Sequence, residues 1–313
     1  MILYLLLILG LVILLAGGKA LVDGASSIAV KLGLSPGIIG LTIVAFGTSA
    51  PELLVSISSA LKGTSDIAVG NVLGSNIANL GLVLGLSGLI YPILIKRTHL
   101  RFDYPVMILV LIIFYAISYD LQISLIDGVF LTFGFLLFNG YLLKDIGKVK
   151  VEQINTHLEE SDEIKEFSWI ISISYFLAGV VALYFGSELL VENAILISRE
   201  HQVSERVIGV TIVAIGTSLP ELITSILAAF YKRTDLAIGN ILGSNILNVL
   251  SIIGITALIK PIAISQEFIQ SDFLWMIGIS LLLFPLIKSK MQISKIEGSI
   301  LLLSYLTYML FLL

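Results

Sequence analysis

Two glutamates, Glu52 and Glu221, stand in the middle of long apolar stretches, each at the end of a nearly identical hexapeptide. The hexapeptides read GTSAPE at 47–52 and GTSLPE at 216–221. A charge at the centre of a bilayer costs at least about 2.5 to 3.5 kcal/mol on insertion scales. Two acidic side chains at that depth therefore need something positive between them, and a bound cation would meet that need.

Oxygen atoms of other kinds accompany each glutamate. Hydroxyl side chains three and four positions earlier can share its helix face, and these residues are Thr48, Ser49, Thr217 and Ser218. Glycine and proline weaken a helix, so we predict a helix break at each hexapeptide, with carbonyls near Ala45 and Ala214 left without an intrahelical partner. At membrane depth such carbonyls are tolerated where they line a cavity or meet another ligand. Oxygen donors without imidazole or thiolate favour Ca²⁺ or Na⁺ over zinc or copper.

A second pair of polar motifs reads GNVLGSNIAN at 70–79 and GNILGSNILN at 239–248. In each, a serine and an asparagine four residues apart share a helix face, and we expect these residues to reach the cation site: Ser75, Asn79, Ser244 and Asn248. Hydrogen bonds between helices are at least as plausible as ion ligation for the remaining asparagines, Asn71, Asn76, Asn240 and Asn245. The GxxxG spacing of the glycines permits close helix contact; these are Gly70, Gly74, Gly239 and Gly243.

The composition indicates that membrane-spanning helices position these motifs. Hydrophobic residues make up 57% of the 313 residues, charged residues only 13%, and the mean hydropathy is +1.05. Soluble domains carry roughly 25% charged residues, and apolar runs of 18 or more residues suffice to cross a bilayer. The absence of cysteine excludes disulfides and thiolate metal sites. We place the histidines, His99, His157 and His201, in polar connectors, and we interpret the N-terminal apolar run as a span and not as a removable signal.

Ten helices are predicted, which makes the fold an all-α membrane protein. Their approximate ranges are 2–30, 37–61, 67–90, 103–119, 124–143, 167–198, 205–231, 236–259, 271–287 and 295–313. The polar connector 144–166 is too short to hold a folded domain, so we interpret it as a cytoplasmic linker between two five-helix units, 1–143 and 167–313. Four acidic residues fall near predicted span ends and are expected to be solvated or to cap helices: Asp23, Asp66, Glu192 and Asp235.

The two units are related by an internal repeat. Residues 39–93 align with 208–262 at an offset of 169 without a gap, and 30 of the 55 positions are identical. The matches include Gly, Pro, Thr, Ser, Asn and Glu in order, which chance matching of apolar runs does not produce. Because five spans is an odd number, the second unit enters the membrane in the opposite orientation, as in the inverted repeats of secondary transporters. A duplicated scaffold without transport activity is the alternative interpretation.

Lysine and arginine predict the orientation. If the N-terminus is outside, thirteen Lys and Arg residues fall in inside connectors and four in outside connectors. Positive residues concentrate on the cytoplasmic side, so both termini are expected outside, with the chain a multi-pass protein of the cell membrane.

With these four motifs in mirrored positions, the sequence resembles the cation/calcium exchanger superfamily in its sodium/calcium exchanger branch. The resemblance covers nearly the whole chain, whereas the Gly-Asn-Ala-Thr-Glu motif usual in the proton/calcium branch is absent. It implies one Ca²⁺ site and three Na⁺ sites, with Glu52 and Glu221 bridging the calcium site and its neighbours. It also implies that the first and sixth helices slide across the others. Close relatives commonly have an acidic residue where this chain has Asn248, which leaves the ion stoichiometry open.

The resemblance further assigns ligand roles by matching positions. Thr48, Thr217 and the carbonyls of Ala45 and Ala214 would join the glutamates. Flanking sodium sites would be completed by Ser49, Ser75, Ser218 and Ser244. Asn79 and Asn248 would lie at the central level.

We therefore predict an antiporter that exchanges Na⁺ for Ca²⁺ by alternating access. Proton-coupled Ca²⁺ transport is the first alternative, since a carboxylate pair can share a proton, and a cation channel is the second. An enzyme is not expected, because no nucleophile constellation or histidine-containing metal motif appears in the spans. The expected partners are Ca²⁺, Na⁺ and the bilayer, with no cofactor, no nucleic acid and a functional monomer.

Overall fold

The computed structural model describes residues 2–145, 167–201 and 214–312, apart from the side chains of residues 145, 214 and 289. In these ranges the chain is helical, with only four two-residue strands. Eight of the described helices are long and apolar enough to cross a membrane, and a ninth span results if the bent pair Pro36–Thr48 and Ala50–Lys62 is counted as one. Residues 205–213 of the predicted seventh span and residues 146–166 of the predicted linker lie outside the described residues.

The helices and strands follow the order of the predicted spans. In chain order the elements are α1 (Ile2–Leu32), α2 (Pro36–Ile39), η1 (Gly40–Val44), α3 (Ala45–Thr48), α4 (Ala50–Lys62), α5 (Ser65–Ala78), η2 (Asn79–Val83), α6 (Leu84–Ile90), β1 (Ile93–Leu94), η3 (His99–Asp103), α7 (Tyr104–Ile117), β2 (Gln122–Ile123), α8 (Leu125–Leu142), η4 (Leu143–Asp145), α10 (Trp169–Glu200), α12 (Ala214–Thr217), α13 (Leu219–Phe230), α14 (Thr234–Leu247), η6 (Asn248–Ile253), α15 (Gly254–Ile259), β3 (Ile262–Ala263), α16 (Gln266–Gln270), α17 (Asp272–Lys290), β4 (Gln292–Ile293) and α18 (Lys295–Leu312).

Both hexapeptides interrupt a helix at their serine. The helix axis bends by 45° between α3 and α4, where Ser49 adopts φ −86° and ψ 6°. Ser218 adopts nearly the same conformation, φ −89° and ψ 7°, between α12 and α13. The following prolines, Pro51 and Pro220, lie in the first turn of the new helix, where their missing N–H removes no hydrogen bond within that new helix.

Wider π-helical turns occur where the sequence predicted continuous α-helix. One, η2, begins at Asn79, and another, η6, begins at the matching Asn248. A third, η1, lies just before the first hexapeptide. Such turns often accompany functional sites, because they displace side chains from the regular helical register.

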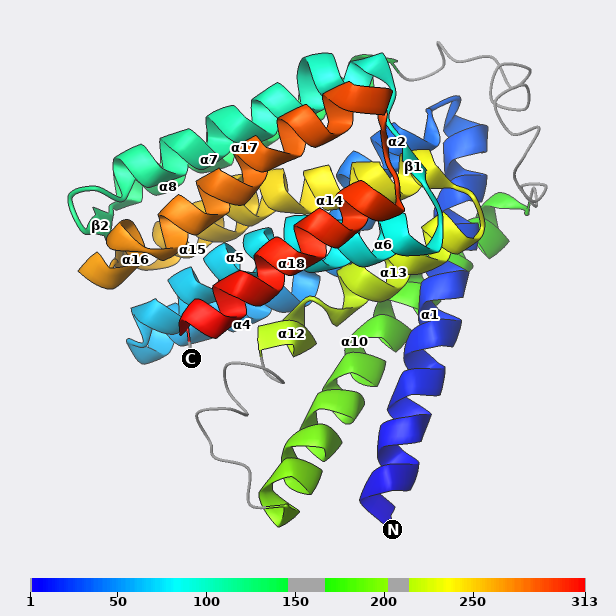
Figure 1. Cartoon of the computed structure of the whole chain (residues 1–313), viewed down its shortest axis with the longest axis horizontal. Coiled ribbons are helices and arrows are strands. Elements are labelled where there is room, and N and C mark those ends of the chain that lie inside the picture. Colours follow the sequence, from blue (N-terminus) through cyan, green and yellow to red (C-terminus); the bar gives the residue numbers. More distant parts are fainter. Residues whose placement is uncertain (1, 146–166, 202–213, 313) are drawn as a thin grey trace.

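Two short sheets join the N- and C-terminal parts of the chain. Strand β1 pairs antiparallel with β4, and β2 pairs antiparallel with β3. Figure 1 shows β1 and β2 towards opposite ends of the helical layer. The helices that follow β2 and β4 begin with matching caps, in which the carboxylates of Asp127 and Glu297 bind the N–H and hydroxyl of Ser124 and Ser294.

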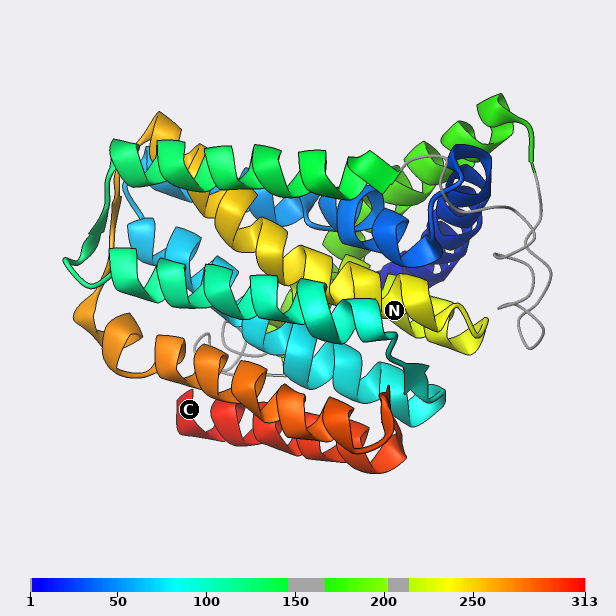
Figure 2. The ribbon, with the colours of Figure 1, turned by 90° about the horizontal axis from the view of Figure 1, so that it is seen from above.

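The long helices α1 and α10 pack against each other and cross the remaining helices at a steep angle (Figures 1 and 2). Glycine allows their backbones to touch. A Cβ atom on Gly24 would lie 2.6 Å from the backbone nitrogen of Phe176, and one on Gly179 would lie 2.5 Å from that of Leu21. Gly10, Gly17 and Gly186 make similar contacts along the same seam. At 31 and 32 residues, both helices are longer than the roughly 20 residues that a perpendicular span requires.

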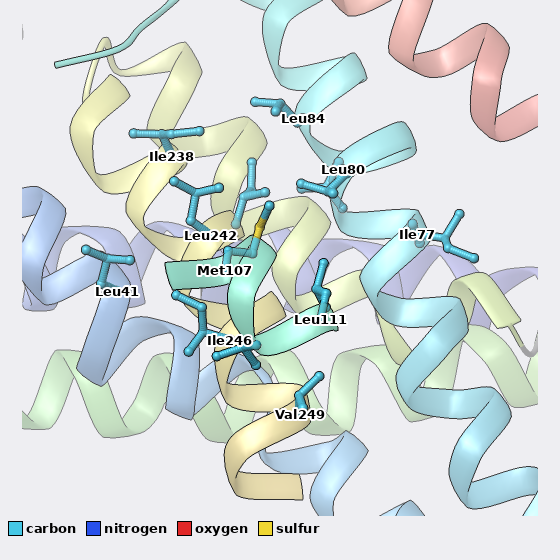
Figure 3. Close-up of a cluster of buried hydrophobic side chains, with 14 of the residues drawn as sticks. Leu41, Ile77, Leu80, Leu84, Met107, Leu111, Ile238, Leu242, Ile246 and Val249 are labelled. Atoms are coloured by element: carbon cyan, nitrogen blue, oxygen red, sulfur yellow. The ribbon is translucent and has the colours of Figure 1, made fainter. Parts of the chain in front are cut away.

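The packed interior lies around α14, which is buried on nearly all sides. Figure 3 shows part of it, where Met107 and Leu111 of α7 lie against Leu242 and Ile246 of α14. The predicted close contacts of Gly239 and Gly243 occur here, against the backbone of residues 37 and 41. The positions that the repeat places opposite Gly70 and Gly74 fall within 202–213, so those two contacts stay predictions.

Candidate cation site

The two glutamates occupy equivalent places at the starts of two broken helices. Glu52 lies in the first turn of α4 and Glu221 in the first turn of α13. The N-terminal end of a helix carries a partial positive charge that favours a carboxylate. Each glutamate is only 1% exposed, so the site is closed to solvent.

Direct contacts connect the two hexapeptides. The hydroxyl of Ser49 donates to Oε1 of Glu221 at 2.7 Å and lies 3.2 Å from the hydroxyl of Ser244. The carboxyl groups of Glu52 and Glu221 are close enough to interact with each other. Side chains 172 residues apart in the chain therefore meet at one place in the interior.

Oxygen atoms without partners concentrate at this place. Thirteen buried side-chain nitrogen or oxygen atoms among the described residues have no hydrogen-bond partner, and seven of them belong to the four motifs. All seven are oxygens: both of Glu52, Oε2 of Glu221, the hydroxyls of Ser75 and Ser218, and Oδ1 of Asn79 and Asn248. A buried polar atom without a partner is costly, and an unpaired carboxylate is more so. The arrangement is thus suited to holding cations.

The predicted threonine and carbonyl ligands differ in their surroundings. Thr48 donates within its own helix, at 3.2 Å to the carbonyl of Val44 and 3.3 Å to that of Ala45, and lies 3.3 Å from Oδ1 of Asn240. Thr217 also has an interaction partner in the structure. The expectation of a bare carbonyl at Ala45 is wrong, because that oxygen also accepts the N–H of Ser49 at 3.0 Å. Ala214 is the first residue of α12, and its ligation stays a prediction.

Proline instead frees a carbonyl two residues further along. An α-helical N–H binds the carbonyl four residues earlier, so Pro51 leaves Gly47 and Pro220 leaves Gly216 without that bond. The hydroxyl of Ser187 on α10 supplies the missing donor to Gly216, at 2.8 Å. Counting four residues back from each proline would have predicted this from the sequence.

Buried asparagines join neighbouring helices around the site. Asn71 donates to the carbonyl of Glu52 and to the hydroxyl of Ser56, both at 3.1 Å. Asn240 donates to Ser225 at 3.0 Å, which is the matching bond in the second half. Bonding between helices, expected for these asparagines as at least an equal possibility, is what both of them do.

The remaining asparagines bond across the two halves. Nδ2 of Asn79 donates to Oδ1 of Asn245 at 3.2 Å. Nδ2 of Asn248 donates to Oδ1 of Asn76 at 3.1 Å. These two bonds are equivalent under the repeat, and in each the donor belongs to a predicted ligand.

Two expectations about charged residues were wrong. Asp23 is not at a solvated span end: it lies within α1, buried, and pairs with the buried Arg233 at 2.8 Å. Arg233 also donates to the carbonyl of Val22 and the hydroxyl of Ser26. The sequence alone did not predict this pair, because it does not reveal that the start of α14 packs against α1.

Asp235 and His99 are the second correction. His99 is buried and not in a polar connector; its Nδ1 lies 2.6 Å from Asp103 and its Nε2 3.5 Å from Asp235. Lys96 also pairs with Asp235. His201 ends α10 and contacts the hydroxyl of Tyr4, as expected of an exposed position, whereas His157 lies outside the described residues.

The described side chains at the site offer oxygen ligands. The described residues contain no group of three or more His, Cys, Asp or Glu side chains that could hold a metal. Carboxylate, hydroxyl and amide oxygens together provide the hard donors that Ca²⁺ and Na⁺ prefer.

Comparisons with known proteins agree with this chemistry. The family model described as "Sodium/calcium exchanger protein" matches residues 2–144 and 171–313. The "Putative antiporter CaxA" of Alkalimonas amylolytica is 39% identical over 306 residues, covering 96% of this chain and 95% of the relative. The sodium/calcium exchanger MaX1 of Methanosarcina acetivorans is 31% identical, covering 98% and 97%. A structure of the sodium-calcium exchanger NCX_Mj soaked with zero Na⁺ and Ca²⁺ has a TM-score of 0.84 and 31% identity, covering 98% of each chain.

Proposed function

This chain belongs to the sodium/calcium exchanger protein family of multi-pass cation/Ca²⁺ antiporters, and we propose that Na⁺ is its coupling ion, exchanged for Ca²⁺ at the Glu52–Glu221 site. The family transports ions and is not a family of enzymes. Ca²⁺ and Na⁺ are accordingly the transported substrates, and no cofactor is indicated.

One observation carries the proposal: seven buried oxygens of the four motifs, three of them from Glu52 and Glu221 themselves, have no hydrogen-bond partner among the described residues. Both oxygens of Glu52 and one of Glu221 have no hydrogen-bond donor among the described residues. The missing partner must be positive and must accept several oxygen ligands, which describes Ca²⁺ or Na⁺. The hydroxyls, the amide oxygens and the backbone carbonyl of Ala214 are proposed to complete the coordination; the Ala45 carbonyl, which accepts hydrogen bonds from Ser49 and Thr48, is not.

Shared ligands explain how exchange is coupled. Ca²⁺ and Na⁺ need the same two carboxylates, so binding of one ion opposes binding of the other. Without either ion, two bare carboxylates would be enclosed together in the bilayer, which is energetically unfavourable. The empty carrier is therefore expected not to cross between its two access states, and each crossing carries ions.

The charge at the centre bears on the stoichiometry. Asn79 and Asn248 are both neutral, so the two glutamates supply two negative charges. One Ca²⁺ balances them, two Na⁺ also balance them, and three Na⁺ leave the site at +1. The reversal potential of exchange at defined Na⁺ and Ca²⁺ gradients distinguishes neutral from charge-moving exchange.

We also propose ten spans in two inverted five-helix halves, 1–143 and 167–313, joined by the linker 144–166. The reciprocal strand pairs support this, because β1 and β3 are equivalent under the repeat and lie in different sheets. The matching breaks at Ser49 and Ser218 support it as well. The distribution of Lys and Arg supports an orientation with both termini outside. We propose that the protein lies in the plasma membrane and acts as a monomer.

Calcium uptake into Na⁺-loaded proteoliposomes tests the function. The wild type is expected to take up Ca²⁺ when Na⁺ is inside and to lose that uptake when internal Na⁺ is replaced by choline. Glu52→Gln and Glu221→Gln keep the side-chain shape but remove the charge, and each is expected to reduce uptake at least about 100-fold, because a buried ligand and its charge are lost together.

Controls and contrary outcomes are specific. Glu267→Gln removes an exposed carboxylate of α16 and is expected to leave uptake unchanged. Full uptake by both glutamate variants would refute the site. Uptake driven by a pH gradient without Na⁺ would show that H⁺, and not Na⁺, is the coupling ion. Ca²⁺ flux without counterflow would indicate a channel.

A further inference from the structure

Each proposed asparagine ligand is the last member of a short chain of buried side chains that begins at a methionine. In one chain, Nδ2 of Asn76 lies 3.7 Å from the sulfur of Met276 on α17. Oδ1 of Asn76 then accepts Nδ2 of Asn248 at 3.1 Å. Oδ1 of Asn248 is left without a protein partner.

The second chain repeats the first with the halves exchanged. Nδ2 of Asn245 lies 3.7 Å from the sulfur of Met107 on α7. Oδ1 of Asn245 accepts Nδ2 of Asn79 at 3.2 Å, and Oδ1 of Asn79 has no partner. Met107 and Met276 are separated by 169 residues, the offset of the repeat, although both lie outside its closely similar part. Figure 3 shows Met107 inside the packed interior and not at its edge.

The chemistry of the thioether gives each chain a direction. A methionine sulfur can accept a hydrogen bond weakly and has no hydrogen to donate. The end of Asn76 that faces Met276 is therefore its NH₂ group, which turns the Asn76 oxygen towards Asn248. Asn248 must in turn present its own NH₂ group to that oxygen. The remaining end of the Asn248 amide is then its oxygen.

Orientation matters because an amide has one end that binds cations and one that repels them. An asparagine rotated by 180° would present an NH₂ group, with partial positive charge, where an oxygen ligand is needed. An aspartate has oxygen at both ends and needs no such control. Two asparagines at the centre of a cation site therefore need neighbours that fix which end faces the ion.

We propose that Met276–Asn76 and Met107–Asn245 are orienting relays that hold the Oδ1 atoms of Asn248 and Asn79 towards the transported cations. The inference rests on the proposed function, because it assumes that Asn79 and Asn248 are ligands. The relay residues do not touch the ion; they are positioning residues. All six side chains in the two relays are at most 1% exposed, so water does not compete for these bonds.

Each relay crosses from one half to the other. Asn76 and Asn79 both lie on the third span, yet Asn76 orients Asn248 whereas Asn79 is oriented by Asn245. This crossing gives the proposal a pattern that simple helix packing would not produce. Loss of Asn76 should affect the role of Asn248 and leave that of Asn79, three residues away, intact.

A double-mutant cycle tests this pattern, with the Ca²⁺ KM and maximal rate of Na⁺-driven uptake as readouts. Asn76→Leu removes the acceptor and is expected to raise the Ca²⁺ KM roughly 10-fold or more, as loss of outer partners of metal ligands does, with the maximal rate changed less. In an Asn248→Ala background, Asn76→Leu should add less than about twofold, because the amide it orients is gone. In an Asn79→Ala background it should retain its full effect.

The reciprocal cycle uses Asn245→Leu. Its effect on the Ca²⁺ KM should disappear in an Asn79→Ala background and persist in an Asn248→Ala background. Met276→Leu conserves volume but removes the acceptor sulfur, and it is expected to raise the Ca²⁺ KM by a smaller factor than Asn76→Leu. Asn139→Leu is the control: Asn139 bonds to the carbonyl of Phe135 in its own helix, α8, and its loss should leave the Ca²⁺ KM unchanged.

A binding readout separates the relay from the transport function. Ca²⁺ raises the unfolding temperature of any protein whose folded state binds it, so the Ca²⁺-dependent shift of purified protein in detergent can be measured for every variant. Asn76→Leu should reduce that shift, whereas a variant damaged only in packing unfolds earlier but keeps it. If Asn76→Leu does not fold, Met276→Leu and Asn76→Asp, which keeps an acceptor for Asn248, supply the same comparison.

Two results would overturn the relay: a Ca²⁺ KM within twofold of wild type in Asn76→Leu, or equal effects of Asn76→Leu in the Asn248→Ala and Asn79→Ala backgrounds. These differ from failure of the proposed function, in which the wild type itself shows no Na⁺-driven uptake. In that case the Ca²⁺-dependent unfolding shift still decides whether the relay orients a Ca²⁺ site.

Discussion

Residues that are equivalent under the internal repeat make similar contacts at the centre of the molecule and different contacts near its two ends. At the centre, the four asparagines that pair across the two halves make equivalent bonds. Near the ends, equivalent positions hold different chemistry: Asp235 pairs with Lys96 and lies near His99, whereas its counterpart Asp66 accepts a hydroxyl from Ser265 at 2.6 Å.

A second pair of positions shows the same contrast. Arg233 ties the start of α14 to Asp23 on α1, but its counterpart Thr64 donates only to the carbonyl of Ser59 in the adjacent helix. The symmetric centre suits a site that must present the same ligands to either side of a membrane. The unlike ends teach that the two access routes need not be energetically equal.

The largest expected effect comes from the charged end of this comparison. Arg233→Ala removes the buried partner of Asp23 and leaves it only the exposed Lys19, 3.3 Å away, so the free energy of unfolding is expected to fall by about 3 kcal/mol, the lower end for breaking a buried ion pair. Thr64→Ala, at the equivalent position, should change it by about 1 kcal/mol or less. Thermal unfolding in detergent measures both. Similar losses in the two variants would show that the ends are not unlike in energy.

The buried histidine gives the next effect in size. His99→Phe copies Phe268, the residue at the equivalent position, and removes the ring nitrogens that face Asp103 and Asp235. Leaving these carboxylates less satisfied is expected to destabilise the protein by about 1 to 3 kcal/mol. Phe268→Leu is the matched control with an apolar residue retained. An unfolding temperature in His99→Phe equal to that of the wild type would show that the contacts of His99 do not stabilise the protein.

Substitutions at the centre should instead act alike. Asn79→Asp and Asn248→Asp each add a carboxylate beside the glutamates, and added ligand charge tightens Ca²⁺ binding. We expect the Ca²⁺ KM to fall by a factor of about ten, or about 1.4 kcal/mol, in both variants. Kinetics of Na⁺-driven uptake provide the measurement. A large difference between the two would mean that the central symmetry is one of shape and not of function.

The smallest effect concerns the carbonyl that Pro220 frees. Ser187→Ala removes its donor and should cost about 0.6 kcal/mol, the average for hydrogen bonds between membrane helices. Gly18 occupies the equivalent position and has no side chain to act in this way. Chemical denaturation in mixed micelles measures the free energy of unfolding of Ser187→Ala against wild type. Ser172→Ala, elsewhere on α10, is the control and loses the hydroxyl contact with Ser27, 2.8 Å away. No difference from wild type would assign that carbonyl to another partner.

Local sequence predicted the elements that depend on local chemistry. Apolar length identified helices such as α1 and α18 within two residues of their bounds, and glycine with proline located the breaks at Ser49 and Ser218. Of the side chains that the motifs predicted as ligands, six are buried with unpartnered oxygens, whereas Thr48, Ser49 and Ser244 bond to other side chains. Family membership followed from the same motifs.

Features that depend on tertiary contacts were missed. The strands are two residues long and exist only because β1 meets β4 and β2 meets β3. The π-helical turns that begin at Asn79 and Asn248 have no local signal in the sequence. Asp23 and His99 were expected at polar positions because the groups that meet them in the interior, Arg233 and Asp235, are distant in the chain. Ala45 differs from these cases: its carbonyl still accepts the N–H of Ser49, whereas the missing N–H of Pro51 affects the carbonyl four residues earlier, at Gly47.

The glycine seam between α1 and α10 has a mechanical consequence. Where two backbones touch with no side chains between them, neither helix can roll about its axis without pressing side chains into its neighbour. The pair therefore behaves as a single strut, with one member from each half of the chain. A movement of this helix pair that opens the interior to one side of the bilayer therefore involves both halves of the chain. Neither half can open access to one side alone.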